Sequence, residues 1–377
     1  MEWKEYSLGD VCSRLSSGKN IKASEVHNDG LYPVFGGNGI RGFTDKQNFN
    51  GECAVIGRQG AYCGNVRYFN GVAYMTEHAL VLQGNEKSET QFLAYLLSIM
   101  DLGRLSGQSA QPGLSVKTLK IQKVSLPNLS DQRKIAGILS ALDSKIENNN
   151  KINANLEAQA EALFKSWFVD FTPFKDQPFV DSELGPIPQG WKVGKLTDIA
   201  VYLNGLAMQK FPPQDIKDSF PVLKIKELGA GICDNSSDRC SNKVPKKYII
   251  EDGDIIFSWS GTLMVDVWCG GQCGLNQHLF KVSSSNYPKW FYYHWTKKHL
   301  RDFIHIARDK AVTMGHIKRG HLDNALVVVP NNFILEKATH LFEPLLNMVI
   351  SKRIENQRLA ALRDTLLPKL MSGEIKL

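Results

Sequence analysis

The apolar positions of the chain fall into two similar series, each of which begins with short runs bounded by glycine and polar residues. Residues 53–56 and 254–257 are such runs, and residues 79–82 and 279–282 follow at a similar distance. Short apolar runs of this kind are typical of buried β-strands. Each series is therefore expected to begin with a β-rich module.

A helical segment is expected next in each series, leucine-rich at residues 92–97 and aromatic at residues 290–295. The aromatic residues recur at helical spacing, which favours core packing over a surface that stacks on bases. The pattern then changes after Pro127 and Pro330, where Asn128 and Ser130 offer N-caps for a new helix.

Each series continues as a long amphipathic stretch whose seam residues alternate at spacings of four and three. The first seam consists of Ile135, Leu139, Leu142, Ile146, Asn149, Asn153, Leu156, Ala160, Leu163 and Trp167. The second, rougher seam consists of Phe342, Leu345, Val349, Lys352, Asn356, Leu359, Arg363, Leu366 and Leu370. This heptad spacing predicts long helices near residues 131–169 and 335–372, which pair with each other because each apolar stripe is too narrow to be stable alone. Pseudo-twofold symmetry between the two series would make the pair antiparallel. The asparagines in the seams cost stability but fix the register of the pair.

Four sequence matches show that the two series are copies of one unit. The matched segments are residues 3–11 with 191–199, 76–80 with 276–280, 124–128 with 327–331, and 146–148 with 354–356. Their offsets of 188, 200, 203 and 208 residues rise steadily, as loop insertions in the second copy require. A proline- and glycine-rich segment between the copies excludes a continuous helix there.

These patterns predict an α+β protein with two pseudo-twofold-related, β-rich modules joined by two long antiparallel coiled-coil helices. The expected boundaries are 1–130 for the first module, 131–170 for the central helix, 171–189 for the linker, 190–330 for the second module and 331–377 for the C-terminal helix.

The composition fits a globular protein with a nucleic-acid partner. The net charge is +7, and no apolar run reaches the roughly 18 residues of a membrane span. Together with an N-terminus that does not have the layout of a signal peptide, this predicts a cytoplasmic protein that does not associate with membranes. Seven cysteines indicate reduced thiols. The spacing of Cys233, Cys240, Cys269 and Cys273 does not match a zinc ribbon, so no metal site is expected.

Several segments resemble the specificity (S) subunits of type I restriction-modification systems, and together they span nearly the whole chain. Residues 126–135 (LPNLSDQRKI) are similar to that family's PPLxEQxxI segment at the start of the central helix. Residues 163–171, 185–191 and 366–375 resemble the end of that helix, the opening of the second copy and the C-terminal signature. Residues 107–115 (GQSAQPGLS) resemble a recurrent segment of target recognition domains, from which residues 311–317 of the second copy depart.

The resemblance implies that each β-rich module is a target recognition domain that reads half of a bipartite site in double-stranded DNA. It implies that the helices are spacers that dock adenine methyltransferase (M) subunits, to which restriction/translocase (R) subunits join. The chain itself would then hold no cofactor, and S-adenosylmethionine, ATP and magnesium would be used by the partner subunits.

The motifs of the relevant enzymes do not occur in the sequence, which agrees with a non-catalytic protein. The chain has neither the Asn/Asp-Pro-Pro-aromatic motif of adenine methyltransferases nor a Walker A loop nor an HExxH motif. His78 and His278 occupy equivalent places, but no nucleophile recurs beside both, which favours structural histidines over catalytic ones.

The candidate DNA-binding residues are polar side chains in glycine-rich loops, chosen because Arg and Lys read guanine whereas Asn and Gln read adenine. They are Lys19, Asn20, Asn38, Arg41, Arg58, Gln59, Gln108, Ser109 and Gln111 in the first copy, and Gln209, Lys210, Ser258, Trp259, Ser260, Thr262, Arg308 and Lys310 in the second. Lys117 and Lys318 are expected to contact phosphates. The alternative is a pseudo-symmetric protein-binding scaffold that does not recognise DNA; a stand-alone repressor is disfavoured because no helix-turn-helix signal occurs.

Overall fold

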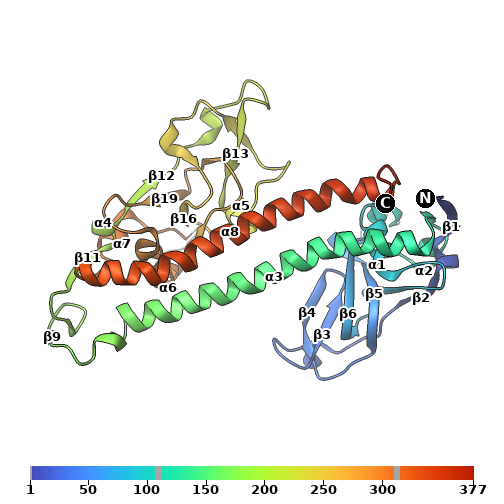
Figure 1. The fold of residues 1–377 in the computed structure, drawn as a ribbon, viewed down its shortest axis with the longest axis horizontal. Coiled ribbons are helices and arrows are strands. Elements are labelled where there is room, and N and C mark those ends of the chain that lie inside the picture. The colour runs from blue at the N-terminus through green and yellow to red at the C-terminus, as the bar shows by residue number, and fades with distance from the viewer. Residues whose placement is uncertain (1, 107–112, 310–314) are drawn as a thin grey trace. The chain divides into compact units, whose positions relative to one another are not determined.

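The computed structural model of the chain describes residues 2–106, 113–309 and 315–377. It divides into two compact units: unit 1 comprises Met1–Ser144 with Leu359–Leu377, and unit 2 comprises Lys145–Arg358. Two helices of 40 residues each, α3 (Leu129–Phe168) and α8 (Asn332–Met371), contribute one end to each unit (Figure 1). Among the described helices, none is both long enough and apolar enough to cross a membrane.

The two long helices begin with the same capping interaction. The side-chain Oδ1 of Asn128 accepts a hydrogen bond of 3.0 Å from the N–H of Asp131 at the start of α3. Asn331 does the same for the N–H of Ile334 at the start of α8, also at 3.0 Å. Each cap satisfies a backbone N–H that has no partner within the helix. The N-cap predicted at Asn128 is therefore confirmed, and its counterpart in the second copy is Asn331.

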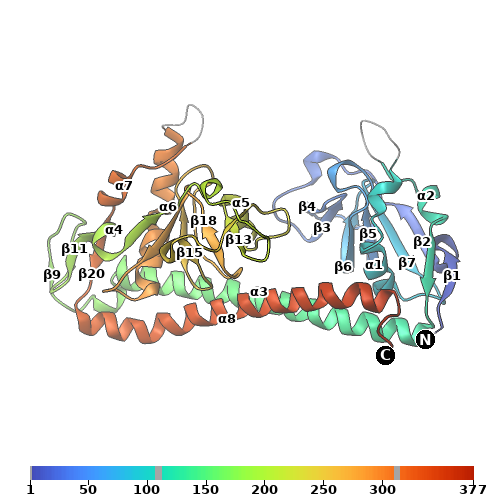
Figure 2. The same ribbon diagram turned by 90° about the horizontal axis from the view of Figure 1, so that it is seen from above.

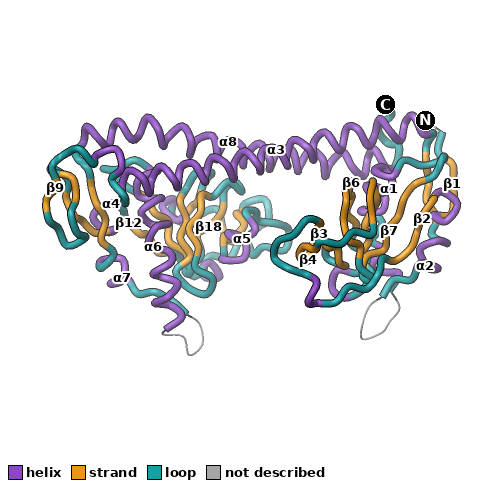
Figure 3. Tube along the Cα trace, turned by 90° about the horizontal axis from the view of Figure 1, so that it is seen from below, coloured by secondary structure: helices purple, strands orange, loops and turns teal. Residues whose placement is uncertain are grey.

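Within each unit the two long helices run antiparallel, as the heptad pattern predicts. In unit 1, Arg363 of α8 donates to Asp143 of α3 at 2.7 Å. In unit 2, Arg353 of α8 donates to Glu157 of α3 at 2.8 Å. Residues later in α3 thus pair with residues earlier in α8, and the two helices lie side by side in every view (Figures 1 to 3).

A layer of asparagines around the buried Asn149 fixes the register of this pair in unit 2. Asn149 is 0% exposed, and its Nδ2 donates to Asn356 Oδ1 at 2.8 Å and to Glu355 Oε2 at 3.1 Å. Asn356, which is half-buried, in turn donates to the exposed Asn150 at 2.8 Å. A shift in register would leave the buried amide of Asn149 without these partners, which costs more than the hydrogen bonds contribute. The predicted role of the seam asparagines agrees with this geometry.

Unit 1 is built around one mixed, six-stranded sheet with the strand order β2-β7-β5-β6-β3-β4. Its neighbours pair antiparallel except β3 and β6, which pair parallel. A separate antiparallel pair, β1 and β8, joins the start of the module to its end. The elements are β1 Lys4–Ser7, β2 Cys12–Ser17, β3 Tyr32–Gly36, β4 Gly39–Thr44, β5 Phe49–Gly57, β6 Val66–Met75, β7 Ala79–Gly84, α1 Thr90–Ser98, α2 Val116–Lys120 and β8 Lys123–Leu126.

The main core of unit 1 lies between this sheet and the helices. Phe92 and Leu93 of α1 are fully buried with Ile135 and Leu139 of α3 and with Leu370 at the end of α8. The helix predicted at residues 92–97 is therefore confirmed, and its apolar side chains pack in the core as expected.

Unit 2 carries two four-stranded sheets, with the orders β12-β19-β16-β17 and β14-β13-β18-β15. Two short antiparallel pairs accompany them, β9 with β10 and β11 with β20. The strands are β9 Phe179–Val180, β10 Ile187–Pro188, β11 Lys192–Lys195, β12 Val201–Asn204, β13 Ser219–Leu223, β14 Arg239–Ser241, β15 Ile249–Ile250, β16 Ile255–Ser258, β17 Met264–Val267, β18 Cys273–Leu275, β19 Leu279–Ser283 and β20 Leu326–Val329. The helices are α4 Leu196–Ile199, α5 Ile225–Ala230, α6 Lys289–Asp309 and α7 Arg319–Asp323.

An aromatic core holds unit 2 together. The indole of Trp290 on α6 stacks on Phe342 of α8 at a centroid distance of 4.4 Å, and Phe168 at the end of α3 packs 5.6 Å from the same indole. Phe174, from the segment between the copies, and Trp191, at the start of the second copy, are buried in this cluster. Aromatic contacts of this kind add to the free energy of burial, so the segment that follows α3 is anchored in the core of unit 2.

The second unit repeats the strand arrangement of the first with two interruptions, since β5 also has two counterparts, β15 and β16. Val34 of β3 pairs in parallel with Tyr74 of β6, and Val222 of β13 pairs in parallel with Gly274 of β18. In unit 1, β6 is one continuous strand, whereas residues 268–272 separate β17 from β18 in unit 2. One six-stranded sheet thus corresponds to two smaller sheets in the second copy.

Candidate nucleic-acid interface

Four loop segments of unit 1 meet at one end of the sheet, and backbone hydrogen bonds hold them together. After β2, the N–H of Gly18 donates to Ala79 O at 3.1 Å and that of Lys19 to Met75 O at 2.9 Å. After β5, the N–H of Arg58 donates to His78 O at 3.0 Å. The fourth segment precedes α2, where the N–H of Leu114 donates to Arg58 O at 2.8 Å. The main chain therefore places these loops independently of their side chains.

The same four hydrogen bonds recur in unit 2. Gly205 donates to Leu279 O and Leu206 to Leu275 O, each at 3.0 Å. The two that define the centre of the network also recur: Trp259 donates to His278 O at 3.4 Å, and Ile317 donates to Trp259 O at 3.0 Å. Trp259 thus takes the place of Arg58. In each unit the short helix after this segment, α2 or α7, lies on the side away from α3 and α8 (Figure 2).

A close backbone approach explains the glycine at the first of these loops. A Cβ atom on Gly18 would lie 2.1 Å from the carbonyl oxygen of Met75, and one on Gly205 would lie 2.2 Å from that of Asn276. No side chain fits at either distance, so glycine is required where the loop after β2 or β12 crosses the turn that leads into β7 or β19. The repeated glycine therefore determines the backbone path of the loop and is not a candidate for ligand contact.

The hairpin between β3 and β4 joins this loop cluster in unit 1. A Cβ atom on Gly57 would lie 2.4 Å from Gly37 O, which shows how closely the hairpin approaches the end of β5. Asn38 and Arg41 of this hairpin are exposed. Arg67 of β6 lies next to it, because its guanidinium carbon would be 3.2 Å from a Cβ on Gly39. Arg67 is exposed and was missed from the sequence because it stands within a strand and not in a glycine-rich loop.

The side chains at the equivalent centre of the two networks differ in chemistry. In unit 1, Nη1 of Arg58 donates to the backbone oxygen of Glu77 at 3.3 Å, and the side chain is half-exposed. In unit 2, Nε1 of Trp259 donates to Asn204 Oδ1 at 3.0 Å, and its ring lies 6.0 Å from that of His278. A guanidinium offers several donors in a plane, whereas an indole offers one donor and a large apolar face. The two units therefore present different recognition chemistry on one backbone framework.

Most of the candidate residues are solvent-exposed, but two are not. Ser258 is 0% exposed and donates to Ser260 O at 3.1 Å, while Ser260 is 7% exposed and shares a 3.1 Å hydrogen bond with Nδ1 of His278. Both hydroxyls face the interior, so the expectation that they face a ligand is wrong. The pattern of the loop did not reveal this, because Ser258 is the last residue of the buried strand β16.

The remaining candidates are either exposed, two of them at the edge of a cavity, or outside the described residues. The exposed ones are Lys19, Asn20, Asn38, Arg41, Gln59, Gln209, Lys210, Thr262 and Arg308, together with the expected phosphate contacts Lys117 and Lys318. Thr262 and Arg308 line one cavity of about 330 Å³ with Ile304 and Gly315. Gln108, Ser109, Gln111 and Lys310 lie outside the described residues.

The arrangement suits recognition, because exposed cations and amides stand on the loops of each unit and such side chains read the edges of base pairs. Within the ranges that the structure describes, no three His, Cys, Asp or Glu side chains are placed to hold a metal ion.

Comparison with known proteins agrees with this picture. Residues 1–158 and 188–359 match the family model described as the type I restriction modification DNA specificity domain. The two matched regions correspond to the two copies of the repeat. The specificity subunit of the type I restriction enzyme MjaIX from Methanocaldococcus jannaschii is 32% identical over 305 residues, covering 76% of this chain and 69% of that protein.

Two further similarities extend the comparison. The EcoprrI specificity subunit of Escherichia coli is 37% identical over 148 residues, which cover 38% of this chain and 37% of that protein. The crystal structure of a type I restriction-modification S subunit from M. genitalium covers 98% of this chain and 96% of its own, with a TM-score of 0.64 at 17% identity. At that identity the structural likeness is evidence for the fold alone.

Proposed function

Because this chain belongs to the family of type I restriction-modification specificity subunits, we propose that it reads a bipartite site in double-stranded DNA and carries methyltransferase and restriction subunits to it. The observation that carries the proposal is the repeated loop network with different side chains at its centre. The repeat gives the chain two recognition surfaces with the same backbone arrangement. Because Trp259 of unit 2 stands at the position of Arg58 in unit 1, the two surfaces would read different sequences.

The exposed candidates suggest how each half-site is read. In unit 1, Arg41 and Arg58 are suited to guanine, because a guanidinium pairs with O6 and N7 in the major groove. Asn20, Asn38 and Gln59 are suited to adenine, whose N6 and N7 offer a donor and an acceptor. In unit 2 we assign the equivalent role to the exposed set of Gln209, Lys210, Thr262 and Arg308, with Trp259 offering an apolar face. Lys117 and Lys318 would contact phosphates and so position the units without specifying sequence.

In this proposal the chain is the non-catalytic part of a larger assembly. The methyltransferase subunits would use S-adenosylmethionine, and the restriction/translocase subunits would use ATP and magnesium. The helices α3 and α8 are the natural docking elements for the methyltransferase subunits, since both extend through the two units and expose one face along their length.

The test is to co-express the chain with its methyltransferase subunit and to map methylated adenines across a host genome. We expect one split motif whose two halves are separated by a gap of fixed length. Methylation without sequence preference would contradict the proposal. So would a complex that forms on the chain but binds DNA no more tightly than the methyltransferase alone, which would instead support a protein-binding scaffold.

A further inference from the structure

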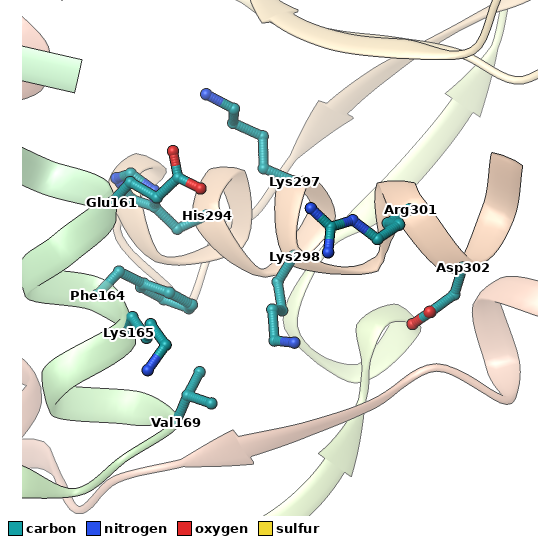
Figure 4. Close-up of a pocket in the computed structure, with 9 residues that line it drawn as sticks. All are labelled: Glu161, Phe164, Lys165, Val169, His294, Lys297, Lys298, Arg301 and Asp302. Carbon is teal, nitrogen blue, oxygen red and sulfur yellow. The ribbon is translucent and has the colours of Figure 1, made fainter. Parts of the chain in front are cut away.

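A pocket of about 380 Å³ lies in unit 2 between the last turns of α3 and the first half of α6 (Figure 4). The side chains from α3 and the residue after it are Glu161, Phe164, Lys165 and Val169; those from α6 are His294, Lys297, Lys298, Arg301 and Asp302. None of these residues belongs to the loop cluster described above. The pocket therefore has no role in the proposed reading of DNA.

The floor of the pocket is aromatic and uncharged. The ring of Phe164 stacks on that of His294 at a centroid distance of 5.2 Å and an interplanar angle of 23°. Burial of the His294 imidazole, together with the charge of nearby Lys297, lowers its pKa to about 3. The imidazole is therefore neutral at physiological pH. Val169, which is partly exposed, extends this apolar surface towards solvent.

The rim of the pocket is cationic. The adjacent residues Lys297 and Lys298, and Arg301 about one turn later, project from α6, as Figure 4 shows. No carboxylate forms an ion pair with any of these three in the described part of the chain. Like charges three and four residues apart on a helix repel and destabilise it slightly, and a cation–π contact of Lys297 with the ring of Tyr293, at 5.4 Å, offsets part of this cost. Lys165 differs, because Asp170 neutralises it at 2.5 Å.

The cationic rim lies on a part of α6 that is nearly absent from the first copy. When α1 and α6 are aligned on their buried phenylalanines, Phe92 and Phe291, the position of Lys297 corresponds to Ser98, the last residue of α1. The positions of Lys298 and Arg301 fall beyond the end of α1. The rim therefore belongs to the additional length of α6 in unit 2.

We propose that this pocket, which we call the α3–α6 pocket, docks an acidic segment of the methyltransferase subunit. An apolar side chain of that segment enters between Phe164 and Val169, and its carboxylates face Lys297, Lys298 and Arg301. The charge complementarity selects an acidic partner. The aromatic floor favours a protein over DNA, because a phosphate backbone has no apolar group to fill it. The assignment rests on the proposed function, since it places a partner of that complex.

The experiment uses the full chain and the purified methyltransferase subunit, without DNA, in calorimetric titrations at low and physiological salt. The test variant is Lys297→Glu, Lys298→Glu and Arg301→Glu together. The matched control is Lys243→Glu, Lys246→Glu and Lys247→Glu, which makes the same charge change at exposed positions elsewhere in unit 2. We expect the test variant to weaken the affinity about tenfold or more, most strongly at low salt, and the control to leave it unchanged.

A second variant, Val169→Ser, tests the apolar part of the site without a change of charge. We expect it to weaken binding by about three- to tenfold at both salt concentrations, since the lost burial does not depend on ionic strength. Circular dichroism would verify that each variant is folded.

Two outcomes would overturn the inference. One is a methyltransferase affinity that is the same for the test and control variants. The other is loss of DNA binding by the test variant with methyltransferase binding intact, which would make the rim a phosphate contact. In both cases methylation of a split motif by the wild-type complex would still support the proposed function, so the two ideas fail separately.

Discussion

Replacing Arg58 by alanine tests whether each unit reads its half-site independently. The loop that carries Arg58 is held by its own backbone, through the 3.0 Å bond to His78 O and the 2.8 Å bond from the N–H of Leu114. Arg58→Ala leaves both of these bonds in place. It removes only the 3.3 Å hydrogen bond from the guanidinium to Glu77 O, which contributes about 1 kcal/mol or less to stability. Unit 1 should therefore fold normally.

The effect on recognition should be larger and confined to one half-site. A bidentate arginine–guanine pair contributes about 1–3 kcal/mol of discrimination against the wrong base. Its loss corresponds to about a fivefold to 150-fold change in relative affinity at one base pair. The assay is competitive binding of the complex to two duplex pools, each with one half-site randomised. We expect Arg58→Ala to relax one position of the first half-site and to leave the second unchanged.

Two controls make the result specific. Trp259→Ala should alter only the second half-site, because Trp259 occupies the equivalent backbone position in unit 2. Lys4→Ala removes an exposed cation from β1, outside the loop cluster, and should alter neither. If Arg58→Ala changed both half-sites, or if Arg58→Ala and Trp259→Ala changed the same one, the reasoning from the repeated network would be refuted.

Four further predictions address the DNA contacts, the scaffold, the helices and the core. The logarithm of the DNA-binding constant should fall linearly with the logarithm of salt concentration, with a slope near −0.9 per neutralised phosphate; titrations that are flat with salt would contradict the phosphate contacts. Gly18→Ala should lower the free energy of unfolding by about 1–3 kcal/mol in thermal melts, because its Cβ would meet a carbonyl oxygen at 2.1 Å. The control is Gly137→Ala on α3, where a Cβ would have nothing within 4 Å; it should stabilise the protein slightly. Inserting seven residues into both long helices, near Asn153 and Leu359, preserves the heptad spacing. The insertion should lengthen the preferred gap between half-sites by about 10 Å, or about three base pairs. The assay is binding to duplexes of varied spacing, and an unchanged preferred gap would show that the helices do not determine it. Burial lowers the pKa of His294 from 6.5 to about 3. The contribution of the neutral imidazole to stability is therefore complete above about pH 6.5 and is lost as the pH falls towards 3. In urea titrations, His294→Phe should lose less unfolding free energy between pH 7.5 and pH 5 than the wild type does.

The features that the sequence predicts correctly are those that a local, periodic signal determines. The heptad seams locate α3 and α8, and the asparagine at position 149 indicates the polar layer that fixes their register. The apolar runs locate β5, β7, β16 and β19, and the rising offsets indicate the repeat. Each of these signals depends on side-chain spacing along one segment, which is why one sequence is sufficient to detect them.

The features that the sequence does not predict depend on contacts between segments far apart in the chain. Ser258 and Ser260 resemble exposed loop residues, but the end of β16 and the ring of His278 turn their hydroxyls inward. Arg67 reaches the loop cluster only because the β3–β4 hairpin folds against it. The division of one sheet into two follows from residues 251–254 and 268–272, which interrupt two neighbouring strands without a distinctive pattern.

The way the loops are held would allow two copies of one fold to read different sequences, as the proposed function requires. The four backbone hydrogen bonds of each network are made by N–H and C=O groups, so exchanging a side chain at the centre leaves the loops in place. The exchange nevertheless changes how many side-chain hydrogen-bond donors remain unbonded at the centre of each network. In unit 1 the guanidinium of Arg58 keeps most of its donors free, because only Nη1 is bonded. In unit 2 the single donor of Trp259 is already used by Asn204. If unit 2 reads DNA as proposed, its hydrogen-bonding contacts would come from other exposed side chains, and Gln209, Lys210, Thr262 and Arg308 are exposed candidates among the described residues.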